Sequence, residues 1–119
     1  MLALGNVTFD CGDPNGVADF WGQALGYQVE HFSSEQSWAA PPDGVRPNLM
    51  FMKVPEPRAA KNRVHLDLVA DDHVAEVRRL IELGATQGET QDVPAFGLTF
   101  TVMQDPEGND LCVAQFTQP

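Results

Sequence analysis

The chain has 119 residues, and its 7 basic and 17 acidic residues give a formal net charge of −10. This length is that of one domain, residues 1–119, with a hydrophobic core of its own. The negative charge excludes nucleic acid and an anionic membrane surface as partners, because both attract positively charged proteins. The sequence shows no secretory signal and no membrane-spanning apolar run, and two cysteines are too few for a disulfide framework, so we expect a cytoplasmic protein.

The first part of the chain predicts a strand followed by a capped helix. Polar and apolar side chains alternate over residues 6–11, which is the period of a strand with one packed face, and Cys11 belongs to the packed face. The apolar residues of the next segment that share one helical stripe are Val17, Phe20, Trp21, Ala24 and Leu25. Asp13 before Pro14 is typical of a helix start, and Gly26 is typical of the left-handed residue that ends a helix.

Three short strands are predicted after this helix. They cover residues 27–32, 37–40 and 48–54, and the turn signal Pro41-Pro-Asp-Gly44 separates the last two. Residues 55–60, which contain two prolines, form the predicted linker to the second half of the chain.

The second half repeats the order of the first. Residues 64–68 alternate like the first strand, Asp71 or Asp72 is the predicted helix cap, and Gly84 is the predicted helix end. The apolar residues on the helical stripe between them are Val74, Val77, Leu80 and Ile81.

The strands predicted after the second helix are a short stretch near Thr86, residues 98–104 and residues 110–116. Each half therefore has the order strand, helix and three strands, with module one at about residues 1–57 and module two at about residues 62–117. His31 and His73 have no chemically grouped neighbours in the sequence and are predicted to be surface residues.

Three motifs in the chain are FWGQALG at residues 20–26, KNRVHLD at residues 61–67 and DPEGN at residues 105–109. Together they resemble the vicinal oxygen chelate superfamily of glyoxalases, bleomycin-resistance proteins and dioxygenases, and its glyoxalase-like branch above all. The resemblance implies an α+β fold in which two βαβββ modules form one open, cupped, eight-stranded mixed sheet with the helices outside. It also implies that the cup binds a small-molecule ligand and that the protein is a homodimer.

In metal-dependent members of this superfamily, the first and last strands of each module supply the metal ligands. The resemblance implies that the corresponding positions here are Asn6, His65, Cys112 and Met52, or Phe51 if the register shifts by one residue. Only His65 is a good ligand for a divalent ion, with the Cys112 thiolate as a further donor for Zn²⁺. We therefore expect a degenerate metal site and no cofactor; a divalent metal, if present, would be held by His65.

His65, Asp67 and Cys112 are the candidate catalytic residues. His65 and Asp67 lie two residues apart on the polar face of their strand, which suits a general base with a neighbouring carboxylate. Cys112 would form a nucleophilic pair with His65 if both face the cup. The alternatives are a structural histidine that a carboxylate satisfies and a cysteine buried as a small hydrophobe.

A second group of residues is predicted to line the ligand-binding face. These residues are Asn6, Thr8, Trp38, Met52, Phe96 and Met103. Trp38 offers a ring for stacking on a planar ligand, and methionine adapts to varied apolar ligands. The competing interpretations are solvent-facing polar residues on an edge strand, a dimer contact for Trp38 and core packing for the methionines.

These residues support three hypotheses about function. The first is a glyoxalase-like small-molecule-binding protein with a degenerate metal site, which would act as a metal-independent lyase or isomerase through His65. The second is a non-catalytic protein that sequesters a drug or metabolite, as bleomycin-resistance proteins do, and the acidity of the chain suits a cationic ligand. The third, a metal-dependent lyase or dioxygenase, ranks lowest because most of its ligand positions carry poor donors.

Overall fold

The computed structural model describes residues 1, 4–45, 47–57, 59–60, 62 and 64–116. The chain divides into two compact units, residues 1–59 and residues 60–119, and each unit is described by itself. In the described part of each unit, one strand, one α-helix and three further strands follow one another, and the second unit adds a short 3₁₀ helix. The two βαβββ modules and the α+β class predicted from the sequence are therefore confirmed. No helix within the described ranges is long and apolar enough to cross a lipid bilayer.

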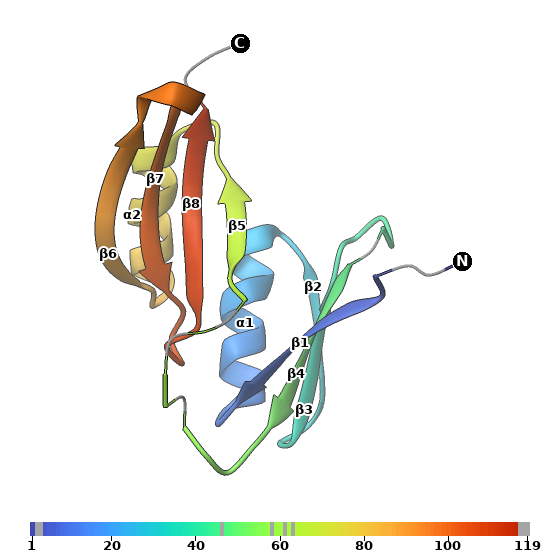
Figure 1. Ribbon diagram of the computed structural model, residues 1–119. Coiled ribbons are helices and arrows are strands. Elements are labelled where there is room, and N and C mark those ends of the chain that lie inside the picture. The colour runs from blue at the N-terminus through green and yellow to red at the C-terminus, as the bar shows by residue number, and fades with distance from the viewer. Residues whose placement is uncertain (2–3, 46, 58, 61, 63, 117–119) are drawn as a thin grey trace. The chain divides into compact units, whose positions relative to one another are not determined.

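The first unit is a mixed four-stranded sheet with a helix packed on one face (Figure 1). Its elements are β1 (Asn6–Cys11), α1 (Pro14–Leu25), β2 (Gln28–Ser33), β3 (Gln36–Ala40) and β4 (Asn48–Lys53). The strand order is β1-β4-β3-β2, with β1 parallel to β4 and the other neighbours antiparallel. The parallel pair is possible because α1 and the β2–β3 hairpin lie between the two strands in the chain and provide the long connection.

Local signals explain where α1 begins and ends. Pro14 occupies the first helical position, where a missing N–H costs nothing, and Gly26 ends the helix at a φ of 72°. The apolar stripe of the helix faces the sheet, where the fully buried Trp21 lies with its ring centroid 5.3 Å from that of Phe9. The helix predicted from the sequence is therefore confirmed, together with the face that it buries.

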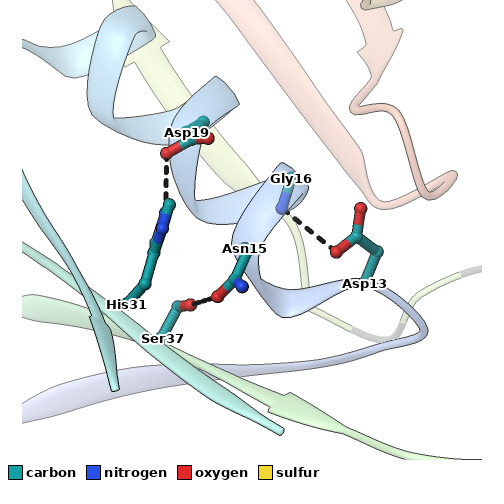
Figure 2. Close-up of polar contacts among 6 residues, drawn as sticks. All are labelled: Asp13, Asn15, Gly16, Asp19, His31 and Ser37. Atoms are coloured by element: carbon teal, nitrogen blue, oxygen red, sulfur yellow. Dashed lines mark hydrogen bonds and ion pairs between the residues drawn. The ribbon is translucent and has the colours of Figure 1, made fainter. Parts of the chain in front are cut away.

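Three polar contacts connect α1 to its cap and to its sheet (Figure 2). They join Asp13 to the N–H of Gly16, Asn15 to the hydroxyl of Ser37, and Asp19 to the ring of His31. Ser37 is fully buried, so its hydroxyl needs the partner that Asn15 provides. His31 Nε2 lies 2.8 Å from Asp19 Oδ1 at the surface, which confirms the predicted exposure of this histidine.

A glycine inside α1 permits close packing between this helix and β2. A Cβ atom added at Gly22 would overlap with the Cγ2 atom of Val29. The valine side chain is branched at Cβ and cannot swing aside freely, so the packing of α1 on β2 depends on the missing side chain.

The pairing of β4 with β1 decides between Met52 and Phe51, the two residues that the sequence left as alternatives for the implied ligand position. Phe9 of β1 is the partner of Phe51, and Asp10 is the partner of Met52. Phe51 is fully buried with its ring centroid 5.2 Å from that of Phe9, whereas Met52 is 37% exposed. Met52 therefore lies on the sheet face away from α1, together with the polar residues of β1.

The second unit is also a mixed four-stranded sheet, with α2 along one face (Figure 1). Its elements are β5 (Leu66–Val69), α2 (His73–Leu83), β6 (Thr86–Val93), the 3₁₀ helix η1 (Pro94–Phe96), β7 (Leu98–Gln104) and β8 (Asp110–Phe116). The strand order is β5-β8-β7-β6, and only the β5–β8 pair is parallel. β6 is an eight-residue strand where the sequence predicts only a short stretch, because this edge strand buries none of its residues and so lacks an apolar pattern.

The structure contradicts the prediction that His73 is a surface residue. Asp72 caps α2, and His73, the first helical residue, is only 8% exposed. Its Nε2 atom lies 2.6 Å from Thr101 Oγ1, and its backbone N–H donates to Gln115 Oε1 at 2.7 Å. The prediction was wrong because both partners come from the sheet, which only the folded chain brings next to the start of the helix.

The structure also contradicts the prediction that Met103 lines a ligand-binding face. The buried apolar residues between α2 and its sheet include Val77, Leu80, Ala85, Met103, Leu111 and Val113. Met103 is fully buried, and its parity in β7 places it on the same face as Thr101. A ligand on the opposite, open face of the sheet therefore cannot reach Met103.

The DPEGN motif forms the turn between β7 and β8. Asp105 is almost completely buried, and its Oδ1 atom accepts the N–H groups of Glu107 at 2.8 Å and Asn109 at 2.9 Å. Its Oδ2 atom accepts the side-chain amide of Asn109 at 2.8 Å. Gly108 has a φ of 85°, which suits glycine. The role of the motif is therefore structural.

Candidate functional site

A histidine, an aspartate and a cysteine meet on the second unit. The potential ligand atoms of His65, Asp67 and Cys112 all lie within 4.8 Å of one another. His65 Nε2 is 3.2 Å from Asp67 Oδ1. The structure thus brings together the three residues that the sequence predicts as catalytic, and we refer to them as the β5–β8 cluster.

Strand pairing places the three side chains on one side of the sheet. Asp67 in β5 is the direct partner of Cys112 in β8, and His65 immediately precedes β5. Residues two apart along an extended chain project to the same side, so His65 and Asp67 share a side. Leu111 and Val113, which flank Cys112, are buried on the side where α2 packs. The β5–β8 cluster therefore lies on the open face of the sheet, away from α2.

The β5–β8 cluster is accessible to solvent. The side chains of His65 and Asp67 are 45% and 69% exposed, and Cys112 is half-buried. Water screens an ion pair at such exposure, so the pair contributes at most about 1 kcal/mol to folding stability. The three groups are therefore open to a ligand, and folding does not depend on their pairing.

The donor atoms of the β5–β8 cluster match the chemistry of Zn²⁺. This ion accepts an imidazole nitrogen, a carboxylate oxygen and a thiolate sulfur, and three protein ligands with one open position are typical of catalytic zinc sites. His65 and Cys112 were predicted from the sequence as credible donors, whereas Asp67 was not. On the first unit, the implied ligand positions Asn6 and Met52 carry an amide and a thioether, which are poor ligands for this ion.

Three of the predicted ligand-binding residues belong to the open face of the first unit, and Trp38 joins them there. Asn6 and Thr8 are exposed residues of β1, and Met52 is exposed at the end of β4. Cross-strand pairing makes one row of residues across this face, in the order Thr8, Met50, Trp38 and Glu30. The predicted ligand-binding residues that the structure brings to this one face of the first sheet are Asn6, Thr8, Trp38 and Met52.

Trp38 lies at the centre of an aromatic and apolar surface on that face. Its ring centroid is 6.4 Å from that of the exposed Phe32, at an interplanar angle of 57°. Met50 is its direct partner in β4. Phe32 and Met50 are not among the residues that the sequence predicts to bind a ligand. Phe32 lies two residues from Glu30 in β2, so the sequence indicates that their side chains share a face of the sheet. Only the pairing of β2 with β3 shows that Trp38 lies on the same face.

Phe96, the remaining predicted ligand-binding residue, is separate from the β5–β8 cluster. It lies in η1, which connects β6 and β7, and it is 72% exposed. The adjacent β7 begins at Leu98, which pairs with Phe116, four residues beyond Cys112 on β8. The structure therefore does not bring Phe96 to the three clustered side chains.

The sequence matches one family model. Residues 6–114 match the model of the glyoxalase-like domain, which covers most of the chain. A comparison with curated proteins finds no match.

Several solved structures share the fold. A glyoxalase/bleomycin resistance protein/dioxygenase family enzyme from Burkholderia phytofirmans PsJN has a TM-score of 0.79 at 17% identity, over 97% of this chain and 99% of the other. A glyoxalase-related enzyme from Fulvimarina pelagi has a TM-score of 0.73 at 17% identity, over 97% and 88%. A lactoylglutathione lyase from Agrobacterium tumefaciens has a TM-score of 0.68 at 16% identity, over 97% and 94%. At such identities the similarity shows the fold alone.

Proposed function

The chain belongs to the family of glyoxalase-like domains, and on that premise we propose that it binds a small molecule and acts as a metal-independent lyase or isomerase through His65. The observation that carries this proposal is the meeting of His65, Asp67 and Cys112 on an accessible sheet face. An imidazole, a carboxylate and a thiol within reach of one another are groups that can accept and donate protons in general acid–base catalysis.

The reaction class that fits this cluster is proton transfer at a carbon atom next to a carbonyl group. His65 removes the proton, and the Asp67 carboxylate, 3.2 Å from Nε2, attracts the positive charge that the ring gains. Cys112 lies beside both groups and can deliver its thiol proton to the carbonyl oxygen, so that the substrate becomes its enol isomer. Transfer of the proton from the His65 imidazolium to the Cys112 thiolate then restores both groups, and no oxidant or reductant is needed.

A metal-dependent lyase or dioxygenase is the alternative that the donor set of the β5–β8 cluster favours. His65, Asp67 and Cys112 would hold the ion, since their donor atoms lie within 4.8 Å of one another. Bound Zn²⁺ would supply Lewis-acid polarisation of a carbonyl oxygen. This alternative differs from the first proposal in one measurable respect, which is its response to chelators.

A second candidate function is non-catalytic sequestration of a drug or metabolite. It is supported by the open face of the first unit, where Trp38, Phe32 and Met50 form an aromatic and apolar surface beside the carboxylate of Glu30. Such a surface suits a flat ligand, and a positively charged one is further attracted by the net charge of −10.

We further propose that the protein acts as a homodimer in the cytoplasm. The dimer is what the resemblance to the superfamily implies, and sedimentation of the purified chain measures it directly. The cytoplasm is compatible with the cysteines, because within the described part of the chain neither Cys11 nor Cys112 forms a disulfide.

The test is a hydrogen-exchange assay on a panel of small α-keto and α-hydroxy carbonyl compounds in D₂O. Proton NMR measures how fast the proton next to the carbonyl is lost. We expect the protein to accelerate this exchange for at least one compound class, and we expect His65→Gln to reduce the acceleration by about 100-fold or more. The matched control is His31→Gln, which removes another exposed histidine next to an aspartate, on the first unit, and is expected to have no effect.

The outcomes of this assay separate the three functions. Exchange that persists in EDTA and disappears in His65→Gln supports the metal-independent enzyme. Exchange that EDTA abolishes and Zn²⁺ restores supports the metal-dependent alternative. Compounds that bind without any exchange support sequestration, and equal exchange in His65→Gln and the unchanged protein refutes a catalytic role for His65.

A further inference from the structure

A groove of about 330 Å³ lies on the helix side of the second unit, between α2 and the edge strand β6. Its walls include Val74, Val77, Arg78 and Ile81 from α2, with Thr90 from β6 and Thr101 from β7. Thr101 is on the buried face of its strand, whereas Cys112 is on the opposite face of the same sheet. The groove is therefore distinct from the β5–β8 cluster. Its volume falls at the lower end of the range for small-molecule pockets.

One wall of the groove is an apolar stripe that β6 leaves uncovered. Val74, Val77 and Ile81 are spaced along one face of α2, and Val74 and Ile81 remain 62% and 43% exposed. The facing strand β6 buries none of its residues. The apolar stripe is therefore available to the hydrocarbon part of a ligand, and covering it would remove apolar surface from water.

The end of the groove near the start of α2 is polar and held by hydrogen bonds. Thr90 Oγ1 lies 2.7 Å from Thr101 Oγ1, which in turn lies 2.6 Å from Nε2 of the buried His73. Thr101 is fully buried, whereas Thr90 is exposed to the groove. When the His73 ring donates its Nε2–H to Thr101 and Thr101 donates to Thr90, the single hydroxyl proton of Thr90 remains available to donate to a carboxylate oxygen of a ligand.

The groove also carries a positive charge. Arg78 is exposed and makes no ion pair with any described residue, whereas its neighbour Arg79 pairs with Glu76 at 2.8 Å. The chain has only 7 basic residues against 17 acidic ones. An anionic ligand is repelled by most of this protein surface, so a cation beside an apolar groove provides local charge complementarity.

We propose that this groove binds a small amphipathic carboxylate, a molecule with one carboxylate and an apolar chain or ring. The carboxylate contacts the Arg78 guanidinium and the Thr90 hydroxyl, and the apolar part lies along Val74, Val77 and Ile81. The site is independent of the proposed function, because it uses none of the residues on the open sheet face.

The test uses octanoate, 1-octanol and octylammonium as probes of equal chain length and different charge. Each is titrated into the full ¹⁵N-labelled chain, and backbone amide shifts locate the binding. We expect octanoate to move the amide signals of residues 74–81 and 87–90 and to bind more tightly than the other two probes. Arg78→Gln is expected to weaken octanoate binding roughly fivefold and to leave 1-octanol binding unchanged.

Arg79→Gln is the matched control, because it removes the same charge from the next position of the same helix. It is expected to leave octanoate binding unchanged, and Ile81→Ala is expected to weaken octanoate and 1-octanol to a similar extent. The proposal is overturned if octanoate shifts only residues 65–67 and 112, if octylammonium binds as tightly as octanoate, or if Arg79→Gln weakens binding as much as Arg78→Gln. Absence of any shift at millimolar octanoate overturns it as well.

Discussion

Replacing Asp105 by alanine should lower the free energy of unfolding of the second unit by about 3 kcal/mol. The Asp105 carboxylate accepts hydrogen bonds from the backbone N–H groups of Glu107 and Asn109 and from the side-chain amide of Asn109. A hydrogen bond to a charged group contributes roughly 1.5–3 kcal/mol. The sum overestimates the loss, because the donor residues Glu107 and Asn109 are only partly buried, so water can replace the lost carboxylate as the acceptor for some of their N–H groups.

Equilibrium urea unfolding followed by far-ultraviolet circular dichroism measures the change, since both tryptophans lie in the first unit and fluorescence would report mainly on that unit. Two other variants serve as controls, because each is expected to lose less stability than Asp105→Ala. Asp105→Asn keeps one acceptor oxygen and should lose less than the alanine variant. Asp92→Ala removes one exposed hydrogen bond, from the Thr99 hydroxyl, and should cost less than about 1 kcal/mol. The expectation is refuted if the free energy of unfolding of Asp105→Ala equals, within error, that of the unchanged protein or that of Asp92→Ala.

Four further substitutions test packing and buried polar contacts. Gly22→Ala should destabilise the first unit by about 1–3 kcal/mol, because the new methyl group overlaps with β2. This loss should outweigh the gain of about 1 kcal/mol in helix propensity that alanine brings. A thermal midpoint at or above that of the unchanged protein would contradict this expectation. Phe51→Ala should lower the free energy of unfolding by about 3–5 kcal/mol, because Phe51 is fully buried, and Met52→Ala should lower it by less than about 1 kcal/mol, because Met52 is exposed. Equal losses of stability in urea unfolding would rule out the observed register of β4. Thr101→Val should cost about 1–3 kcal/mol, because the buried His73 ring loses its hydrogen-bond partner; an unchanged urea midpoint would show that the ring finds another partner.

Helix positions were predictable because their signals are local. The signals for α1 come from Asp13, Pro14 and Gly26, each of which acts on backbone groups only a few residues away. In the structure Asp13 caps the helix, Pro14 begins it and Gly26 ends it, as expected. Gly84 ends α2 as expected, and Asp72, one of the two predicted alternatives, is its cap. β6 was largely missed for the complementary reason, since an edge strand without buried residues leaves no apolar pattern in the sequence.

The faces of the strands were harder to predict. Sequence alternation shows that two faces differ, but a shift of one residue exchanges them. Phe51 and Met52 remained alternatives until the pairing of β1 with β4 was known, and Met103 was assigned to the wrong face. His73 was misplaced because its hydrogen-bond partners belong to strands far away in the sequence.

The sequence by itself determined the two modules, both ends of α1, the C-terminal end of α2 and the family, because capping residues, periodicity and short motifs act over a few neighbouring residues. Only the tertiary structure decided which side chains meet. His65 and Asp67 stand beside Cys112 because β5 pairs in parallel with β8, and the groove under α2 exists because β6 leaves the stripe of that helix uncovered. The first arrangement depends on pairing between segments that are distant in the sequence, and the second depends on how α2 packs against its sheet. No local pattern in the sequence encodes either of them.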